Sequence, residues 1–254
     1  MAWDPQQYEL FQAARMRPGH DLIAALPTMH PDTIADLGCG TGRLTRMLAD
    51  RWPAATVIGL DNSEPMLAKA AQEQSRVAWE LGDIGGWTAP RPLDLIFSNA
   101  ALQWLPDHET LFPRLVGMLK PGGVLAVQMP RNYGAPSHRI MGEMAINGQW
   151  AGKLAGVLRS DPVHPPQWYW RALAPLAGSV EIWETEYLHA LEGENPVLEW
   201  IKGTGLLPVL EALTEGERAG FLAEYGALLR RAYPAEPNGR TLFPFRRLFM
   251  IARV

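Results

Sequence analysis

The stretch DLGCGTG occupies residues 36–42, between a short apolar run and an amphipathic one. The short run, Thr33 to Leu37, predicts a strand, and apolar residues at helical spacing predict a helix directly after the loop. Glycines allow a tight turn there and let a ligand approach the backbone at the N-terminus of the helix. Gly38, Gly40 and Gly42 therefore predict a cofactor-binding loop, although their GxGxG spacing lacks the GxGxxG of the dinucleotide fingerprint.

The same alternation of short apolar runs and longer amphipathic runs continues from this loop to residue 130, and it is typical of strand-helix-strand units with a parallel sheet. Strands are predicted at Thr33–Leu37, Thr56–Leu60, Val77–Leu81, Leu93–Ser98, Val124–Met129 and Phe243–Val254. A helix capped by Asp107 is expected to carry Leu111, Leu115 and Leu119 on one side. We expect two helices across residues 195–233, and we expect the first helix of the chain to end at Pro18.

The composition is that of a globular protein: 254 residues, 47% hydrophobic and 20% charged. A formal net charge of −4 and a pI near 5.9 provide no overall positive field, so nucleic acid and anionic membrane surfaces are not expected partners. Cys39 is the only cysteine, which excludes an internal disulfide and a cysteine-based zinc site and favours the cytoplasm. The sequence starts without a leader pattern and has no apolar stretch of membrane-spanning length. The composition does not specify an oligomeric state.

Acidic residues follow the second and third predicted strands. The Asp61 carboxylate can accept hydrogen bonds from both ribose hydroxyls of an adenosine, with Asn62 beside it in either a binding or a capping role. Asp83 can accept from an exocyclic amine while Ile84 packs on the base. The alternative for Asp61 is a plain turn or helix cap.

Two further segments are expected near the cofactor. Asn99 and Trp104 belong to a polar and aromatic segment after the fourth strand, where open α/β sheets bind ligands, with a core position as the alternative for Trp104. Tyr8 and Arg15 share one face of the predicted N-terminal helix and are expected to belong to a lid. The alternative for that helix is a plain surface position.

The loop at residues 36–42, Asp61, the Gly82-Asp83 pair and the LKPGG turn at 119–123 resemble class I S-adenosylmethionine-dependent methyltransferases. The resemblance implies a Rossmann-like α/β sheet of seven strands, mostly parallel with an antiparallel last strand. It also implies S-adenosylmethionine as the cofactor and S-adenosylhomocysteine as its product. Asp36 and Gly38 would then lie near the methionine part, and Asp61 at the ribose.

Other runs, which have no part in a general cofactor site, resemble the trans-aconitate 2-methyltransferases. They are WDPxxY at residues 3–8, RMRP at 15–18, NAALQWLPD at 99–107, AVQMP at 126–130 and RLF at 247–249. We expect one methyltransferase domain over residues 1–254, with lid helices at 4–27 and helical cap insertions at 132–178 and 193–238. The resemblance implies a small polycarboxylate such as trans-aconitate as the methyl acceptor.

A carboxylate acceptor is already ionised at neutral pH, so in-line methyl transfer to it needs positioning but no metal and no general base. We therefore expect no catalytic acid or base. The carboxylates that do not react need cationic and hydrogen-bonding partners. The candidates for substrate binding are Arg17, Arg131, Tyr133, His138, Tyr169 and Arg247, with surface ion pairing or core packing as the alternative for each.

Three other functions remain as alternatives. The first is methylation of another small molecule, with His138 as a base. The second is binding of S-adenosylmethionine without catalysis, and the third is a nicotinamide dehydrogenase, against which the GxGxG spacing argues.

Overall fold

A computed structural model describes residues 11–158 and 163–254, which divide into two compact units. The sheet unit comprises the described residues within 17–130, 162–185 and 247–254. The helical unit comprises those within 11–16, 131–161 and 186–246. The organisation into one domain with caps at 132–178 and 193–238 stays a prediction.

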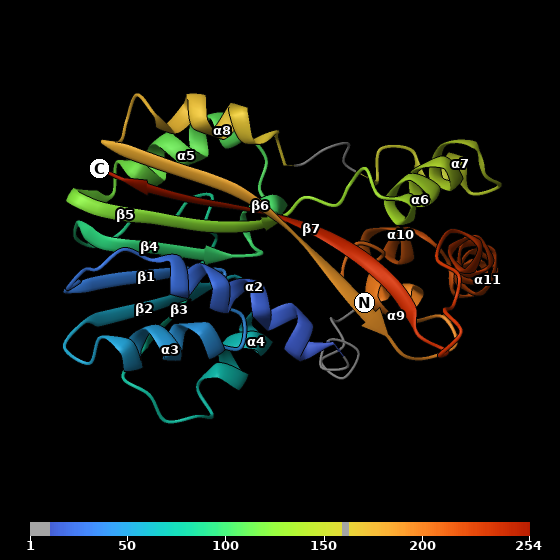
Figure 1. The fold of residues 1–254 in the computed structure, drawn as a ribbon, viewed down its shortest axis with the longest axis horizontal. Coiled ribbons are helices and arrows are strands. Elements are labelled where there is room, and N and C mark those ends of the chain that lie inside the picture. Colours follow the sequence, from blue (N-terminus) through green and yellow to red (C-terminus); the bar gives the residue numbers. More distant parts are fainter. Residues whose placement is uncertain (1–10, 159–162) are drawn as a thin grey trace. The chain divides into compact units, whose positions relative to one another are not determined.

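The described residues form a seven-stranded sheet with the order β3-β2-β1-β4-β5-β7-β6, which confirms the predicted fold class (Figure 1). The pairs β1·β2, β1·β4, β2·β3 and β4·β5 are parallel, and β7 runs antiparallel to β5. The strands are β1 Thr33–Leu37, β2 Thr56–Asp61, β3 Ala78–Leu81, β4 Leu93–Asn99, β5 Leu119–Pro130, β6 Ser179–Leu191 and β7 Thr241–Arg253.

Strand β1 lies in the core of the sheet unit. Every residue of β1 is buried, as expected for a central parallel strand covered on both faces. Ala35 is the register partner of Ile58 on β2 and Ile96 on β4. Because the carboxyl ends of parallel strands meet at one edge, Asp61, the loop after β1 and Asn99 follow one another along that edge.

The helices are α2 Gln12–Ala25, α3 Arg43–Arg51, α4 Glu64–Ala70, α5 His108–Val116, α6 Pro136–Asn147, α7 Ala151–Leu154, α8 Pro166–Leu173, α9 Pro196–Lys202, α10 Leu207–Ala212 and α11 Glu215–Ala232, with a short 3-10 turn, η1, at Leu102–Trp104. The described parts of α2, α6 and α8 fall within the predicted lid and first cap, and α9 to α11 fall within the second.

Three sequence predictions about the helices are wrong. Helix α2 continues past Pro18 to Ala25, because burial of Leu22 and Ile23 offsets the lost backbone hydrogen bond. Leu119 belongs to β5 rather than to α5, which ends at Val116. Residues 195–233 form three helices instead of two, because the chain turns again after α9 and after α10.

The helical unit has its own apolar core. Trp200, Phe221 and Tyr225 are among its largest fully buried side chains, and helix α11 packs on α6 and α9. A capping box joins Thr214 and Glu217 at the start of α11. None of the described helices is both long enough and apolar enough to cross a membrane.

Candidate functional site

The loop after β1 adopts a conformation that requires its glycines. Gly38, Gly40 and Gly42 have φ angles of +78°, +54° and +74°, in the left-handed region that other residues rarely adopt. The backbone N–H groups of Gly38 and Cys39 both donate to the carbonyl oxygen of Leu60, at 2.8 and 3.0 Å. The loop is therefore fixed to the end of β2.

Asp61 meets this loop directly. Its Oδ2 accepts a hydrogen bond from the backbone N–H of Gly40 at 2.8 Å, and its Oδ1 accepts from the N–H of Ser63 at 2.9 Å. The prediction that the glycine loop and Asp61 meet at one sheet edge is thus confirmed. The hydrogen bond from Ser63 shows that Asp61 also stabilises a turn, which was the alternative role predicted for it. Ribose binding by Asp61, with the exposed Asn62 beside it, stays a prediction.

Asp36 lies beneath the loop and is almost fully enclosed, with 2% of its surface exposed. The hydroxyl of Thr45 on α3 donates to its Oδ2 at 2.6 Å. Burial raises the pKa of the Asp36 carboxyl from 3.8 to about 7, because desolvation outweighs the hydrogen bond from Thr45. This group therefore titrates near neutral pH.

Asp36→Asn is expected to change how stability depends on pH. Between about pH 4 and pH 7 the folded protein retains a proton on Asp36 that the unfolded chain has already released. The stabilisation from this proton is therefore complete below pH 4 and is lost as the pH rises to about 7. The free energy of unfolding of the wild type, relative to Asp36→Asn, should fall by at most about 1.4 kcal/mol per pH unit across that window. Urea titrations of both proteins at pH 4.5 to 7.5 measure this difference in unfolding free energy. A difference that does not change with pH would contradict the raised pKa of Asp36.

Trp79 on β3 was not among the sequence-predicted site residues, although it shapes the loop. A Cβ added at Gly42 would lie 2.2 Å from the Trp79 ring, and one at Gly59 would lie 2.6 Å from it. The Arg46 guanidinium sits 5.9 Å from the same ring centroid and donates to the carbonyl of Thr41 at 3.1 Å. Only the cross-strand register that pairs Gly59 with Trp79 reveals this packing.

The segments after β3 and β4 converge on Gly38. A Cβ at Gly38 would lie 2.2 Å from that of Ala101 and 3.7 Å from Cδ1 of the buried Ile84. Asp83 is exposed, and its Oδ1 accepts from the N–H of Gly85 at 2.8 Å. Trp104 is 57% exposed, so the alternative that placed it in the core is wrong.

Three substrate candidates lie in the sheet unit. Arg17 is exposed on α2, with its Nε 4.0 Å from Oδ2 of Asp21. Arg247 is buried on β7, where it is the register partner of Pro130. Tyr169 is fully buried on α8. Their roles toward substrate stay predictions.

The Tyr169 hydroxyl belongs to a directed chain of hydrogen bonds. Nε2 of the buried His108 lies 2.9 Å from the Leu102 carbonyl, which can only accept, so this nitrogen carries the proton. Nδ1 then accepts from the Tyr169 hydroxyl at 2.7 Å, and that oxygen accepts from the N–H of His164 at 3.2 Å. Tyr169 thereby supports the turn η1, which carries Trp104.

The candidates in the helical unit are Arg15, Arg131, Tyr133 and His138. Tyr8 lies outside the described residues. Arg15 donates to the carbonyl of Trp200 at 2.9 Å and sits 5.1 Å above its ring. The backbone N–H of Arg131 donates to the Arg246 carbonyl at 3.0 Å. Which of them reach a ligand stays a prediction.

His138 and Tyr133 contact each other edge to face, with ring centroids 5.3 Å apart. Burial lowers the pKa of His138 from 6.5 to about 4, and its Nδ1 lies 3.3 Å from the hydroxyl of Ser137. His138 is therefore neutral at pH 7.

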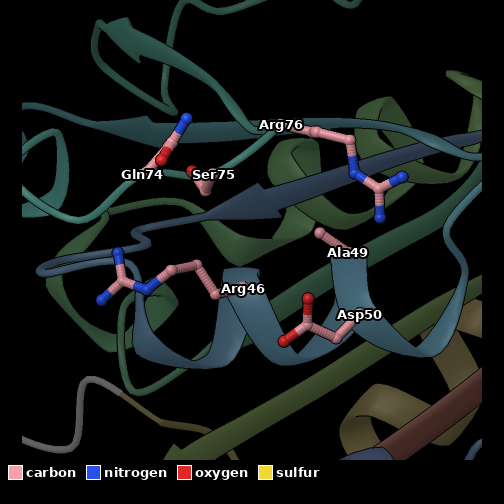
Figure 2. Close-up of a pocket in the computed structure, with 6 residues that line it drawn as sticks. All are labelled: Arg46, Ala49, Asp50, Gln74, Ser75 and Arg76. Atoms are coloured by element: carbon pink, nitrogen blue, oxygen red, sulfur yellow. The ribbon is translucent and has the colours of Figure 1, made fainter.

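A groove elsewhere on the sheet unit is lined by Arg46, Ala49, Asp50, Gln74, Ser75 and Arg76 (Figure 2). The partly buried Arg46, with 14% of its side chain exposed, forms an ion pair with Glu73 at 3.0 Å. None of the sequence-predicted site residues lines it. Within residues 11–158 and 163–254, no three His, Cys, Asp or Glu side chains are grouped to hold a metal ion.

A family model described as "Methyltransferase domain" matches residues 34–123, which include the glycine loop, Asp61 and Asp83. The trans-aconitate 2-methyltransferase of Azoarcus sp. strain BH72 is 48% identical over 98% of this chain and 98% of its own length. That of Streptomyces avermitilis is also 48% identical, over 99% of this chain and 96% of its own length.

The fold is also found in solved structures. The phosphoethanolamine N-methyltransferase 2 of Haemonchus contortus, in complex with phosphomonomethylethanolamine and S-adenosylhomocysteine, aligns with a TM-score of 0.55 and 17% identity. The alignment covers 93% of this chain and 52% of that one. At this identity the likeness concerns the fold alone.

Proposed function

The chain belongs to the trans-aconitate 2-methyltransferase family, and on that premise we propose that it esterifies a carboxylate of trans-aconitate with the methyl group of S-adenosylmethionine. The observation that carries the proposal is the full-length similarity to these enzymes, together with the contact between Gly40 and Asp61 at the sheet edge. S-adenosylhomocysteine is the second product.

The residues at this edge fit the cofactor. A Cβ at Gly40 would meet no atom within 4 Å, so the loop leaves open space beside a backbone that already has a positive φ. Asp61 supplies a carboxylate for the ribose, and the exposed Asp83 supplies one for the exocyclic amine next to the apolar Ile84. We assign Asp36 and Gly38 to the methionine part, with Asn62, Asn99, Trp104, Tyr8 and Arg15 completing the cofactor site.

The cofactor supplies an electrophilic methyl group on a sulfonium, and the protein supplies alignment. The acceptor carboxylate is ionised at neutral pH, so no residue has to remove a proton from it. The neutral His138 fits a hydrogen-bonding role better than that of a base. We therefore assign no acid or base.

The acceptor has three carboxylates, of which only one reacts. Guanidinium groups bind carboxylates through two parallel hydrogen bonds, so we assign Arg17, Arg131 and Arg247 to the carboxylates that do not react. Tyr133 and His138 are assigned to the same acid as hydrogen-bonding groups. The buried Tyr169 hydroxyl already donates to His108 and accepts from the His164 N–H, so its predicted contact with the acid is replaced by support of the turn η1. The single cysteine, Cys39, supports a cytoplasmic setting. The net charge of −4 supports the absence of nucleic-acid and membrane partners, and we propose both.

The function is tested with S-adenosylmethionine labelled in its methyl group. Incubation with trans-aconitate is expected to yield a methyl ester that mild base hydrolyses, whereas methylated phenols and amines would survive the same treatment. cis-Aconitate and citrate serve as matched acids. Turnover of a phenol or an amine without ester formation from any of the three acids would contradict the proposal.

A further inference from the structure

Gln128 on β5 is a fully buried carboxamide between apolar residues of its own strand. Its register partner on β7, Phe249, stacks on Trp183 with ring centroids 5.0 Å apart. Within the described part of the chain, neither Oε1 nor Nε2 of Gln128 has a hydrogen-bond partner. A buried polar group without a partner costs free energy, so its presence in an otherwise apolar strand calls for a ligand or another function.

Two more carboxamides adjoin it, and we call Asn99, Gln103 and Gln128 the carboxamide cluster. Asn99 is the register partner of Gln128, so the two side chains project to the same face of the sheet. Among the described residues, Oδ1 of Asn99 and Oε1 of Gln103 are also buried without a partner. Over the described ranges of the chain, the carboxamide cluster therefore contains three side-chain oxygens and one amide nitrogen that lack a hydrogen-bond partner.

The backbone between these residues is strained and held in place. Ala100 has a φ of 56°, which costs energy in a residue other than glycine. Its N–H donates to the carbonyl of Gln128 at 2.9 Å, and its carbonyl accepts from Nε2 of Gln103 at 2.7 Å. Backbone strain that neighbouring residues maintain is typical of ligand sites.

The strand order places this cluster relative to the proposed cofactor. Along the sheet edge, Asp61 ends β2, Gly38 follows β1, Asn99 ends β4 and Gln128 lies on β5. Neighbouring strands are about 4.8 Å apart. With the ribose at Asp61 and the methionine part at Gly38, the methyl acceptor lies farther along the edge, over β4 and β5.

The charges of the reaction favour neutral groups at this position. A carboxylate oxygen forms a bond to the methyl carbon while the carbon–sulfur bond breaks, and the bonding electron pair stays on sulfur as a thioether. The anion and the sulfonium cation both lose their charge, and no proton is transferred. An arginine on the reacting carboxylate would stabilise the reactants more than the transition state, which would slow the step.

We propose that the carboxamide cluster holds the reacting carboxylate, with the Gln128 N–H groups donating to its oxygens and the carboxamide oxygens of Asn99 and Gln103 facing the sulfonium. The cluster positions two opposite charges with dipoles alone, while the arginines bind the carboxylates that do not react. This inference rests on the proposed function and adds the subsite at which the ester forms.

Gln128→Leu tests it, with the exposed Gln74→Leu in the groove of Figure 2 as the matched control. We expect kcat/KM for trans-aconitate to fall about 10- to 100-fold, from the loss of a hydrogen bond to a charged group. The Kd of S-adenosylmethionine should stay within about twofold of the wild-type value. The midpoint of thermal unfolding should not fall, because leucine replaces an amide that has no partner. Gln74→Leu should match the wild type in all three measurements.

A purely structural role for Gln128 predicts lower stability with proportionate losses for both ligands, and that result would overturn the inference. If the wild type esterifies trans-aconitate, an unchanged kcat/KM of Gln128→Leu for this acid would also overturn the inference. Should Gln128→Leu fail to fold, Gln128→Met carries the same test.

If the wild type esterifies none of the acids, the proposed function is wrong. The inference about the carboxamide cluster is then tested by the binding of the acids alone. For this test, the midpoint of thermal unfolding is measured with saturating S-adenosylhomocysteine and one of the three acids, trans-aconitate, cis-aconitate or citrate. Stabilisation of the wild type but not of Gln128→Leu by one of these acids would support the carboxylate subsite. Equal stabilisation, or none in either protein, would refute it.

Discussion

Asp61→Ala is expected to weaken binding of S-adenosylmethionine by about 10- to 100-fold, the loss expected for one or two hydrogen bonds to a charged group. The substitution removes the proposed acceptor for the ribose hydroxyls. It also leaves the backbone N–H groups of Gly40 and Ser63 without the carboxylate that they contact at 2.8 and 2.9 Å. Isothermal titration calorimetry on the purified protein measures the change.

Asp50→Ala is the matched control, since Asp50 is an exposed carboxylate on α3 of the same unit. Its affinity for the cofactor should equal that of the wild type. An Asp61→Ala protein that binds S-adenosylmethionine as tightly as Asp50→Ala would remove Asp61 from the cofactor site. Its contacts with Gly40 and Ser63 would then be only those of a turn.

Gly42→Ala is expected to lower both stability and cofactor affinity. The new Cβ would lie 2.2 Å from the ring of Trp79, at a φ of +74°. Overpacking of this kind costs about 1 to 3 kcal/mol, and the left-handed conformation adds about 1 to 2 kcal/mol. Because the loop must move to relieve the overlap, the Kd for S-adenosylmethionine should rise more than about tenfold.

Gly40→Ala separates these two costs in the cofactor-free protein. It has a φ of +54° but open space for a Cβ, so it should incur the backbone cost alone. The combination of Gly42→Ala with Trp79→Leu should recover part of the lost stability, which a double-mutant cycle in urea measures. Equal unfolding free energies for Gly40→Ala and Gly42→Ala, without recovery in the double variant, would contradict the packing argument.

The strands β1, β2 and β4 were predictable because each is a short, largely apolar run followed by turn residues, and a strand buried on both faces shows no regular polar alternation. Thr33–Leu37 was predicted with the bounds observed, and Thr56–Leu60 ended one residue before β2 does. The helices were less predictable. Pro18 disrupts a helix locally, but burial of Leu22 on the same helix offsets that cost, and burial is not written in the local sequence.

Trp79 and Gln128 illustrate what the local sequence could not indicate. The Trp79 ring occupies the space beside Gly42 and Gly59, where a Cβ would otherwise lie. The need for glycine at these positions is therefore apparent only once the neighbouring strand and its register are known. Gln128 stands among apolar residues of β5, where a single amide is equally compatible with a paired core group. Only the absence of a partner for its amide among the described residues distinguishes the two cases.

The sequence by itself determined that glycines and an acid follow consecutive strands of a parallel sheet, because periodicity and turn chemistry are local properties. The tertiary structure decided that the Asp61 carboxylate accepts from the Gly40 amide and that Trp79 packs on the third glycine of the loop. It also decided that three carboxamides are gathered beside a strained Ala100. These features depend on strand order and register, which bring together residues that lie far apart in the chain.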